Sequence, residues 1–201
     1  MSRRVCCLVS LIVAAFPALA QLPDGVKAVW ETKLAYHETT PTRERISING
    51  LWRWQPGSGH DVPAADWGYL RVPQPWPGNE RRGAPPSRFF YPNAAWSKTP
   101  LRNVTSAWYQ REITAPAEWS GRRITLQVSY LNSYAEVYLD GKRAGEMRYP
   151  AGEIDVTPLI QPGRAQLLSI LVVAMPLKAV MLSYSDSANA RTVEGLSLIH
   201  I

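Results

Sequence analysis

The sequence predicts an all-β protein built as an antiparallel β-sandwich, and three observations support this. Short segments between residues 108 and 173 alternate apolar and polar side chains, which is the period of a strand with one buried face. Turn-forming residues separate these segments. No heptads, internal repeats or low-complexity tracts occur. Such spacing is typical of an antiparallel sheet packed on a core.

The first part of the chain, residues 1–20, is predicted to be a secretory signal peptide. Arg3 and Arg4 precede an apolar stretch that ends in a small-residue cleavage site at Ala20. The stretch is too short to span a membrane, so no membrane span is expected. We expect an exported protein, periplasmic or extracellular after cleavage near Ala20.

Cysteine content and charge exclude several kinds of site. Cys6 and Cys7 are the only cysteines, and both lie in the signal segment, so the mature domain should hold no disulfide or cysteine metal site. The formal net charge is +6, but the basic residues occur singly or in pairs such as Arg122-Arg123, interleaved with acids. We interpret them as a solvated surface, and nucleic acid is not an expected partner.

The N-terminal half is irregular. Residues 21–44 form a polar lead-in with little periodicity, and residues 45–54 are expected to be the first strand. Residues 55–107 are rich in proline and glycine and should be long surface loop, with one short strand at 68–72. Long loops in compact domains are often functional.

The C-terminal half is regular. Asp140-Gly141 predicts a hairpin with a type I′ turn, because that turn needs positive φ at both central residues. The expected strands are 108–114, 124–129, 135–140, 142–147, 152–156 and 167–173.

An ordered set of motifs is similar to that of a known family. The motifs are Gly50-x-Trp52, Val72-Pro73-x-x-Trp76, Trp108-Tyr109-x-Arg111, the segment AEVYLDG at 135–141, and Asp155-Val156-Thr157. Together they strongly resemble the N-terminal sugar-binding domain of glycoside hydrolase family 2, which includes β-galactosidases, β-glucuronidases and β-mannosidases. The resemblance covers roughly residues 45–196 and implies a galactose-binding-like jelly-roll β-sandwich that binds carbohydrate. It also implies a parent enzyme that hydrolyses the O-glycosidic bonds of β-glycosides.

The C-terminus departs from the family pattern. A further strand and a catalytic barrel follow a Gly-Leu pair in the family, whereas here residues 197–201 follow Gly195-Leu196 and the sequence ends. We therefore expect the last strand to be missing, residues 197–201 to be an anomalous truncated tail, and the C-terminal domains of the parent to be missing partners.

No catalytic residue is assigned. Glycoside cleavage needs two carboxylates flanking the scissile bond, and the family carries both on its barrel. Asn79-Glu80 superficially resembles the acid/base pair of the family, but it lies in a proline- and glycine-rich loop, so we interpret Glu80 as a surface residue. The chain alone is expected to be inactive.

The resemblance implies substrate-binding residues at the rim of a neighbouring barrel. Asn93, in Tyr91-Pro92-Asn93, matches one such position, and Asn189, with Asp186 nearby, falls at the other. Each could accept hydrogen bonds from sugar hydroxyls. The alternative for Asn93 is a turn-forming role after proline, and surface or turn roles are favoured for Asp186 and Asn189.

Trp76 and Trp96 lie in predicted loops, where an exposed aromatic ring would offer a platform to the apolar face of a sugar. Packing in the core or against another domain is the alternative, and it is favoured for most of the eight tryptophans. No metal or cofactor is expected, because His37, His60 and His200 share no ligand spacing.

Two further functions stay open from the sequence. One is a stand-alone carbohydrate-binding module, and the other is a structural or interaction domain that touches no sugar.

Overall fold

The computed structural model describes residues 20, 22–78, 89–131, 134–174 and 196–200. Within these residues the chain forms strands and short 3-10 helices but no α-helix. None of the described helices is long and apolar enough to cross a membrane. The predicted all-β antiparallel fold is confirmed.

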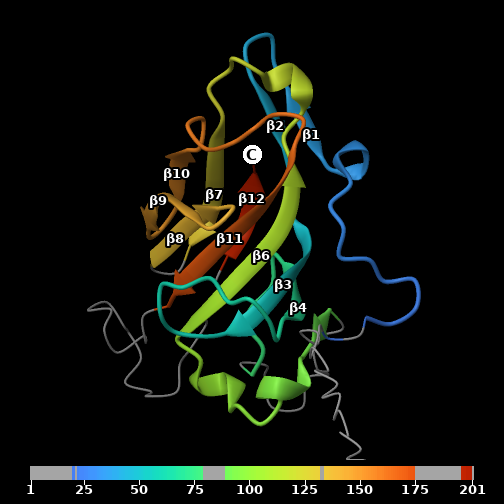
Figure 1. Cartoon of the computed structure of the whole chain (residues 1–201), viewed down its shortest axis with the longest axis vertical. Coiled ribbons are helices and arrows are strands. Elements are labelled where there is room, and N and C mark those ends of the chain that lie inside the picture. The colour runs from blue at the N-terminus through green and yellow to red at the C-terminus, as the bar shows by residue number, and fades with distance from the viewer. Residues whose placement is uncertain (1–19, 21, 79–88, 132–133, 175–195, 201) are drawn as a thin grey trace, which may run out of the picture.

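The strands form two main sheets and a separate hairpin (Figure 1). The large sheet has the order β5 (Phe90–Tyr91), β4 (Gly68–Val72), β3 (Gly50–Pro56), β6 (Ser106–Thr114), β11 (Ala165–Val173), β8 (Tyr134–Leu139) and β9 (Lys142–Arg148). The small sheet has the order β10 (Gly152–Asp155), β7 (Thr125–Leu131) and β12 (Leu196–His200). The hairpin consists of β1 (His37–Thr39) and β2 (Glu44–Ile46). The 3-10 helices are η1 (Thr32–Leu34), η2 (Ala94–Trp96), η3 (Leu101–Asn103) and η4 (Ala117–Trp119).

One hydrophobic core lies between the two sheets. Alternate residues of the central strands of the large sheet point into it, as the period of two requires, and the small sheet contributes the facing layer. The core members from β6, β11 and β7 are Ala107, Tyr109, Ile113, Leu168, Ile170, Val172, Leu126, Val128 and Leu131. Burial of these two apolar faces is the main stabilising contribution to the sandwich.

The predicted hairpin turn between β8 and β9 is confirmed. Asp140 has φ +48° and Gly141 has φ +76°, so both central residues occupy the left-handed region. The Asp140 carboxylate accepts hydrogen bonds from the Leu167 amide at 2.9 Å and from Gln166 Nε2 at 2.9 Å. The bond from Gln166 is the largest cause that lowers the pKa of Asp140. The turn is therefore tied to β11 as well as to its own hairpin.

Two expectations about strands need correction. The strand predicted over 45–54 is divided into β2 and β3 by residues 47–49, and β3 begins at Gly50, whose φ is +130°. The last strand is not missing: residues 196–200 form β12, which pairs antiparallel with β7, Leu196 opposite Leu131. A strand beside β7 satisfies backbone groups that an open edge would leave unpaired.

A buried arginine joins the lead-in to the large sheet. Arg111 of β6 donates to the carbonyl oxygens of Ile48 at 3.2 Å, Asn49 at 3.0 Å and Val29 at 3.4 Å. Its side chain is buried, and this burial lowers its pKa to about 10. A Cβ on Gly50 would lie 2.9 Å from Arg111 Nη1, so the close approach requires glycine there.

Candidate functional site

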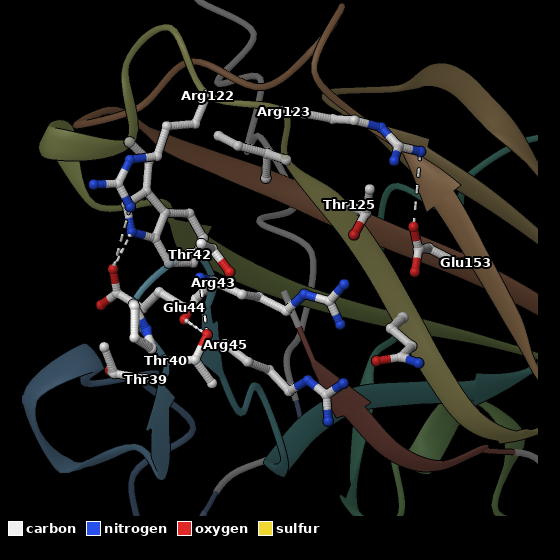
Figure 2. A pocket seen from close by; sticks show the side chains of 14 residues that line it. Thr39, Thr40, Thr42, Arg43, Glu44, Arg45, Arg122, Arg123, Thr125 and Glu153 are labelled. Carbon is white, nitrogen blue, oxygen red and sulfur yellow. Dashed lines mark hydrogen bonds and ion pairs between the residues drawn. The ribbon is translucent and has the colours of Figure 1, made fainter.

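The described part of the chain contains a cleft of about 700 Å³, which we call the arginine cleft (Figure 2). It lies between the β1–β2 hairpin and the β7–β10 strands of the small sheet. Its lining is dominated by arginine and threonine, and the lining residues are Thr39, Thr40, Pro41, Thr42, Arg43, Glu44, Arg45, Trp119, Arg122, Arg123, Ile124, Thr125, Gln127 and Glu153. Four guanidinium groups and two carboxylates make the cleft basic.

One wall of the arginine cleft is the β1–β2 hairpin. Its turn closes because Thr40 Oγ1 accepts from the Arg43 amide at 3.0 Å, while the Thr40 amide donates to the Arg43 carbonyl at 2.8 Å. Arg43 and Arg45 are two residues apart, so they extend from the same side of the strand into the cleft, as Figure 2 shows. Arg45 Nη1 also contacts Glu38 Oε2 across the hairpin at 3.4 Å.

The opposite wall follows η4. Arg123 pairs with Asp155 at 3.0 Å and with Glu153 at 3.7 Å, both on β10. The hydrogen bond to Asp155 is the largest cause that raises the pKa of Arg123. Trp119 Nε1 donates to Glu44 Oε2 at 2.7 Å, and Arg122 Nη1 lies 3.7 Å from the same carboxylate oxygen. Glu44 therefore links the β1–β2 hairpin to the wall that carries Trp119 and Arg122.

The lining of the cleft offers hydrogen-bonding and charged groups that could bind a ligand. Planar guanidinium groups recognise carboxylates and sulfates through paired N–H donors, and threonine hydroxyls and Gln127 add neutral donors and acceptors. Among the described residues, no group of three or more His, Cys, Asp or Glu side chains is arranged to hold a metal ion. The sequence interpretation of the basic residues as a solvated surface agrees with the side chains of Arg122 and Arg123, which are 58% and 69% exposed, but it did not indicate that four arginines gather around one cleft. The spacing of Arg43 and Arg45 was the available signal.

The predicted platform tryptophans are not exposed. Trp76 is 1% exposed and Trp96 is 8% exposed, and both belong to the main core. Trp76 Nε1 donates to the Tyr109 hydroxyl, and Trp96 Nε1 donates to the Asp66 carbonyl at 2.7 Å. The loop folds back over the sheet, so the rings pack inside it, and the platform expectation was wrong for both residues.

Asn93 also lies inside the fold, at 4% exposure. Its Oδ1 accepts from the Ala95 amide at 2.8 Å and thereby caps η2, and its Nδ2 donates to the Trp67 carbonyl at 3.2 Å. These contacts match the turn-forming alternative for this residue. Asn93 does not line the arginine cleft, and Asp186 and Asn189 lie outside the described residues.

A second polar cluster lies on the outer face of the large sheet. Glu136 of β8 is 5% exposed and accepts hydrogen bonds from Tyr138 at 2.6 Å, Tyr134 at 2.7 Å and His60 Nδ1 at 2.8 Å. Burial alone would raise the pKa of Glu136, but these hydrogen bonds outweigh it and lower the pKa to about 2. Burial and the same carboxylate raise the pKa of each tyrosine to about 12. The cluster fastens the loop before β4 onto the sheet.

The chain matches no protein-family model. It does match curated relatives. The β-glucuronidase of Felis catus is 28% identical over 137 residues, which is 65% of this chain and 21% of the relative. The β-glucuronidase of Homo sapiens is 27% identical over 157 residues, covering 74% of this chain and 24% of the relative. The chain is homologous to the N-terminal region of β-glucuronidases. These relatives are members of glycoside hydrolase family 2, so the resemblance in the motifs is confirmed.

Solved structures agree with this homology. The β-glucuronidase of Faecalibacterium prausnitzii is 27% identical, with a TM-score of 0.51, over 68% of this chain and 22% of that chain. The β-glucuronidase of Bifidobacterium dentium, solved with coumarin-3-O-glucuronide, has a TM-score of 0.53 over 69% of this chain, and its 21% identity supports the fold alone. The chain thus spans about a fifth of the length of the β-glucuronidases it matches.

Proposed function

We propose that this chain is the N-terminal, non-catalytic β-sandwich domain of an exported glycoside hydrolase that acts on β-linked glucuronides or related β-glycosides. The homology to the first fifth of β-glucuronidases carries the proposal. Two carboxylates in the remainder of the parent enzyme would cleave the glycosidic bond by a retaining mechanism. The sandwich would support that catalytic part and contribute polar groups to the rim of its pocket.

The candidate rim residues have different roles in this proposal. We assign Asn93 the role of fixing the loop around η2, because both ends of its amide already make hydrogen bonds within the fold. Asp186 and Asn189 would contact the sugar at the rim of the pocket.

Residues 1–20 would be a signal peptide in this proposal. Mass spectrometry of the exported protein should then find a mature chain that begins near Gln21.

The decisive experiment is to sequence the source gene past codon 201 and express the complete reading frame. We expect an in-frame continuation that releases para-nitrophenol from para-nitrophenyl β-D-glucuronide, with retention of anomeric configuration in the sugar product. A stop codon directly after codon 201 in the source DNA would refute the proposal. A complete product without activity on any β-glycoside would refute its enzymatic part.

A stand-alone carbohydrate-binding module is the second candidate, and the arginine cleft is the observation that favours it. A module of the aromatic-platform kind is disfavoured, because Trp76 and Trp96 are buried. In this second candidate, the polar and charged side chains of the arginine cleft would bind the sugar.

A further inference from the structure

The arginine cleft contains cationic groups that the fold does not use. Among the described residues, Arg43 is exposed and its guanidinium makes no hydrogen bond or ion pair, although its backbone closes the hairpin turn. Arg45 makes one long contact, at 3.4 Å, with an exposed carboxylate. By contrast, the carboxylates in the lining are engaged at the walls, Glu44 with Trp119 and Glu153 with Arg123. Among the four guanidinium groups of the lining, Arg43 is thus the one without a carboxylate partner in the described part of the chain, and Arg45 is held only by its contact with Glu38.

The size and lining of the cleft fit a ligand larger than a simple ion. A volume of about 700 Å³ is in the range of pockets that hold small organic ligands. Hydroxyl groups from both walls, including Thr42 and Thr125, alternate with the guanidinium groups, as Figure 2 shows. A ligand that satisfies this lining must present anionic groups and many hydroxyls together.

We propose that the arginine cleft binds an anionic oligosaccharide, in which carboxylate or sulfate groups on neighbouring sugars pair with Arg43 and Arg45 while the sugar hydroxyls bond to the threonines. The arginine fork binds either anion through two parallel N–H donors. This inference takes carbohydrate as the partner from the proposed function. Its test uses this chain alone, so its failure leaves the reading-frame experiment unaffected.

The experiment is isothermal titration calorimetry of the purified chain with four probes. These are a β-linked tetraglucuronate, a sulfated cellotetraose, neutral cellotetraose and inorganic sulfate. We expect the anionic tetrasaccharides to bind at least about tenfold more tightly than cellotetraose, because each charge-assisted pair adds roughly a factor of ten. The anionic tetrasaccharide with the higher affinity shows whether the cleft prefers carboxylate or sulfate groups. Raising NaCl from about 50 to about 300 mM should weaken this binding.

The variant Arg43→Gln/Arg45→Gln should lose at least about tenfold in affinity for the anionic probes and leave weak binding of cellotetraose unchanged. Arg148→Gln, which removes an exposed arginine on β9 outside the cleft, is the matched control and should bind like the parent chain. The unfolding midpoint verifies that each variant folds. Because Arg43 is exposed, the single variant Arg43→Gln replaces the double variant if the latter unfolds.

Three results would overturn the proposal. The first is equal affinity for neutral and anionic tetrasaccharides. The second is inorganic sulfate binding as tightly as the oligosaccharides, which would indicate a simple anion site. The third is binding of the anionic tetrasaccharides that survives in the folded variant Arg43→Gln/Arg45→Gln, whatever the behaviour of Arg148→Gln.

Discussion

The hydroxyl of Tyr138 donates a hydrogen bond of 2.6 Å to Glu136, two residues earlier on the same face of β8. The face is not open to solvent there, since the Tyr138 ring packs against Trp108 at a centroid distance of 5.5 Å and the loop holding Trp67 covers both rings. A carboxylate in such surroundings is stable only while its hydrogen-bond donors are present. Attachment of the loop that holds Trp67 therefore depends on the charged carboxylate of Glu136 and on its bond from Tyr138.

Tyr138→Phe should lower the free energy of unfolding by about 1–3 kcal/mol, because it removes a donor from a buried charged acceptor. Urea unfolding at neutral pH measures this. Tyr36→Phe, which alters an exposed tyrosine just before β1, is the control and should change stability little. Equal stability of Tyr138→Phe and the parent would mean that water replaces the lost donor.

Glu136 should make the protein sensitive to acid. Its pKa is lowered from 4.5 to about 2, so its charged form is favoured by folding. The stabilisation is fully present above pH 4.5 and is lost as the pH falls through that value toward about 2. Urea unfolding midpoints across this range should fall more steeply for the parent than for Glu136→Gln. Parallel curves would show that other carboxylates cause the acid response.

Gly141→Val should destabilise the β8–β9 hairpin by about 1–3 kcal/mol, because φ is +76° and a β-branched residue is strongly disfavoured there. Thermal unfolding gives the measurement. Lys142→Val places the same side chain at the next position, which is an exposed strand residue, and should be tolerated. If both variants unfold at the same temperature, the turn has relaxed to another type.

Trp76→Ala should act on folding and not on sugar recognition. The ring is 1% exposed and its Nε1–H donates to Tyr109, so truncation creates a cavity and leaves a buried hydroxyl without its donor. We expect a loss of about 3–5 kcal/mol in unfolding free energy.

Neutral β-linked oligosaccharides should bind to the folded parent chain only in about the millimolar range, as measured by calorimetric titration. The reason is that a few neutral hydrogen bonds do not offset the free energy lost on immobilising the ligand. Micromolar binding of a neutral sugar would contradict this.

The chain alone should not hydrolyse β-glycosides. Catalysis needs a matched carboxylate pair, and the only sequence resemblance to one is at Glu80, which lies outside the described residues. Purified protein incubated with para-nitrophenyl β-D-glucuronide should release no more product than buffer. Turnover that Glu80→Gln abolishes would refute the assignment of catalysis to the rest of a parent enzyme.

Local patterns predicted the strands from Ser106 to Val173 and the turn at Asp140, because alternation and turn chemistry are encoded by adjacent residues. They did not predict the burial of Trp96, which depends on a loop returning over β4 to reach the carbonyl of Asp66. The arginine cleft was missed for a similar reason. Arg43 and Arg123 are brought together by a hairpin in a segment without clear periodicity, and no local rule relates them.

The position of β11 bears on how the chain is made. Among the described strands of the large sheet it comes last in the sequence, yet it lies in the interior of that sheet, between β6 and β8. During synthesis, the strands from β3 to β6 and the β8–β9 hairpin cannot be joined into one sheet until β11 is available. Until then each group of strands has an edge whose backbone groups are unpaired. Ala165–Val173 joins them only after leaving the ribosome, through contacts distant in sequence that form slowly. A nascent chain that stalls before this strand would present two unpaired edges at once, and chaperone binding would be most valuable at that moment.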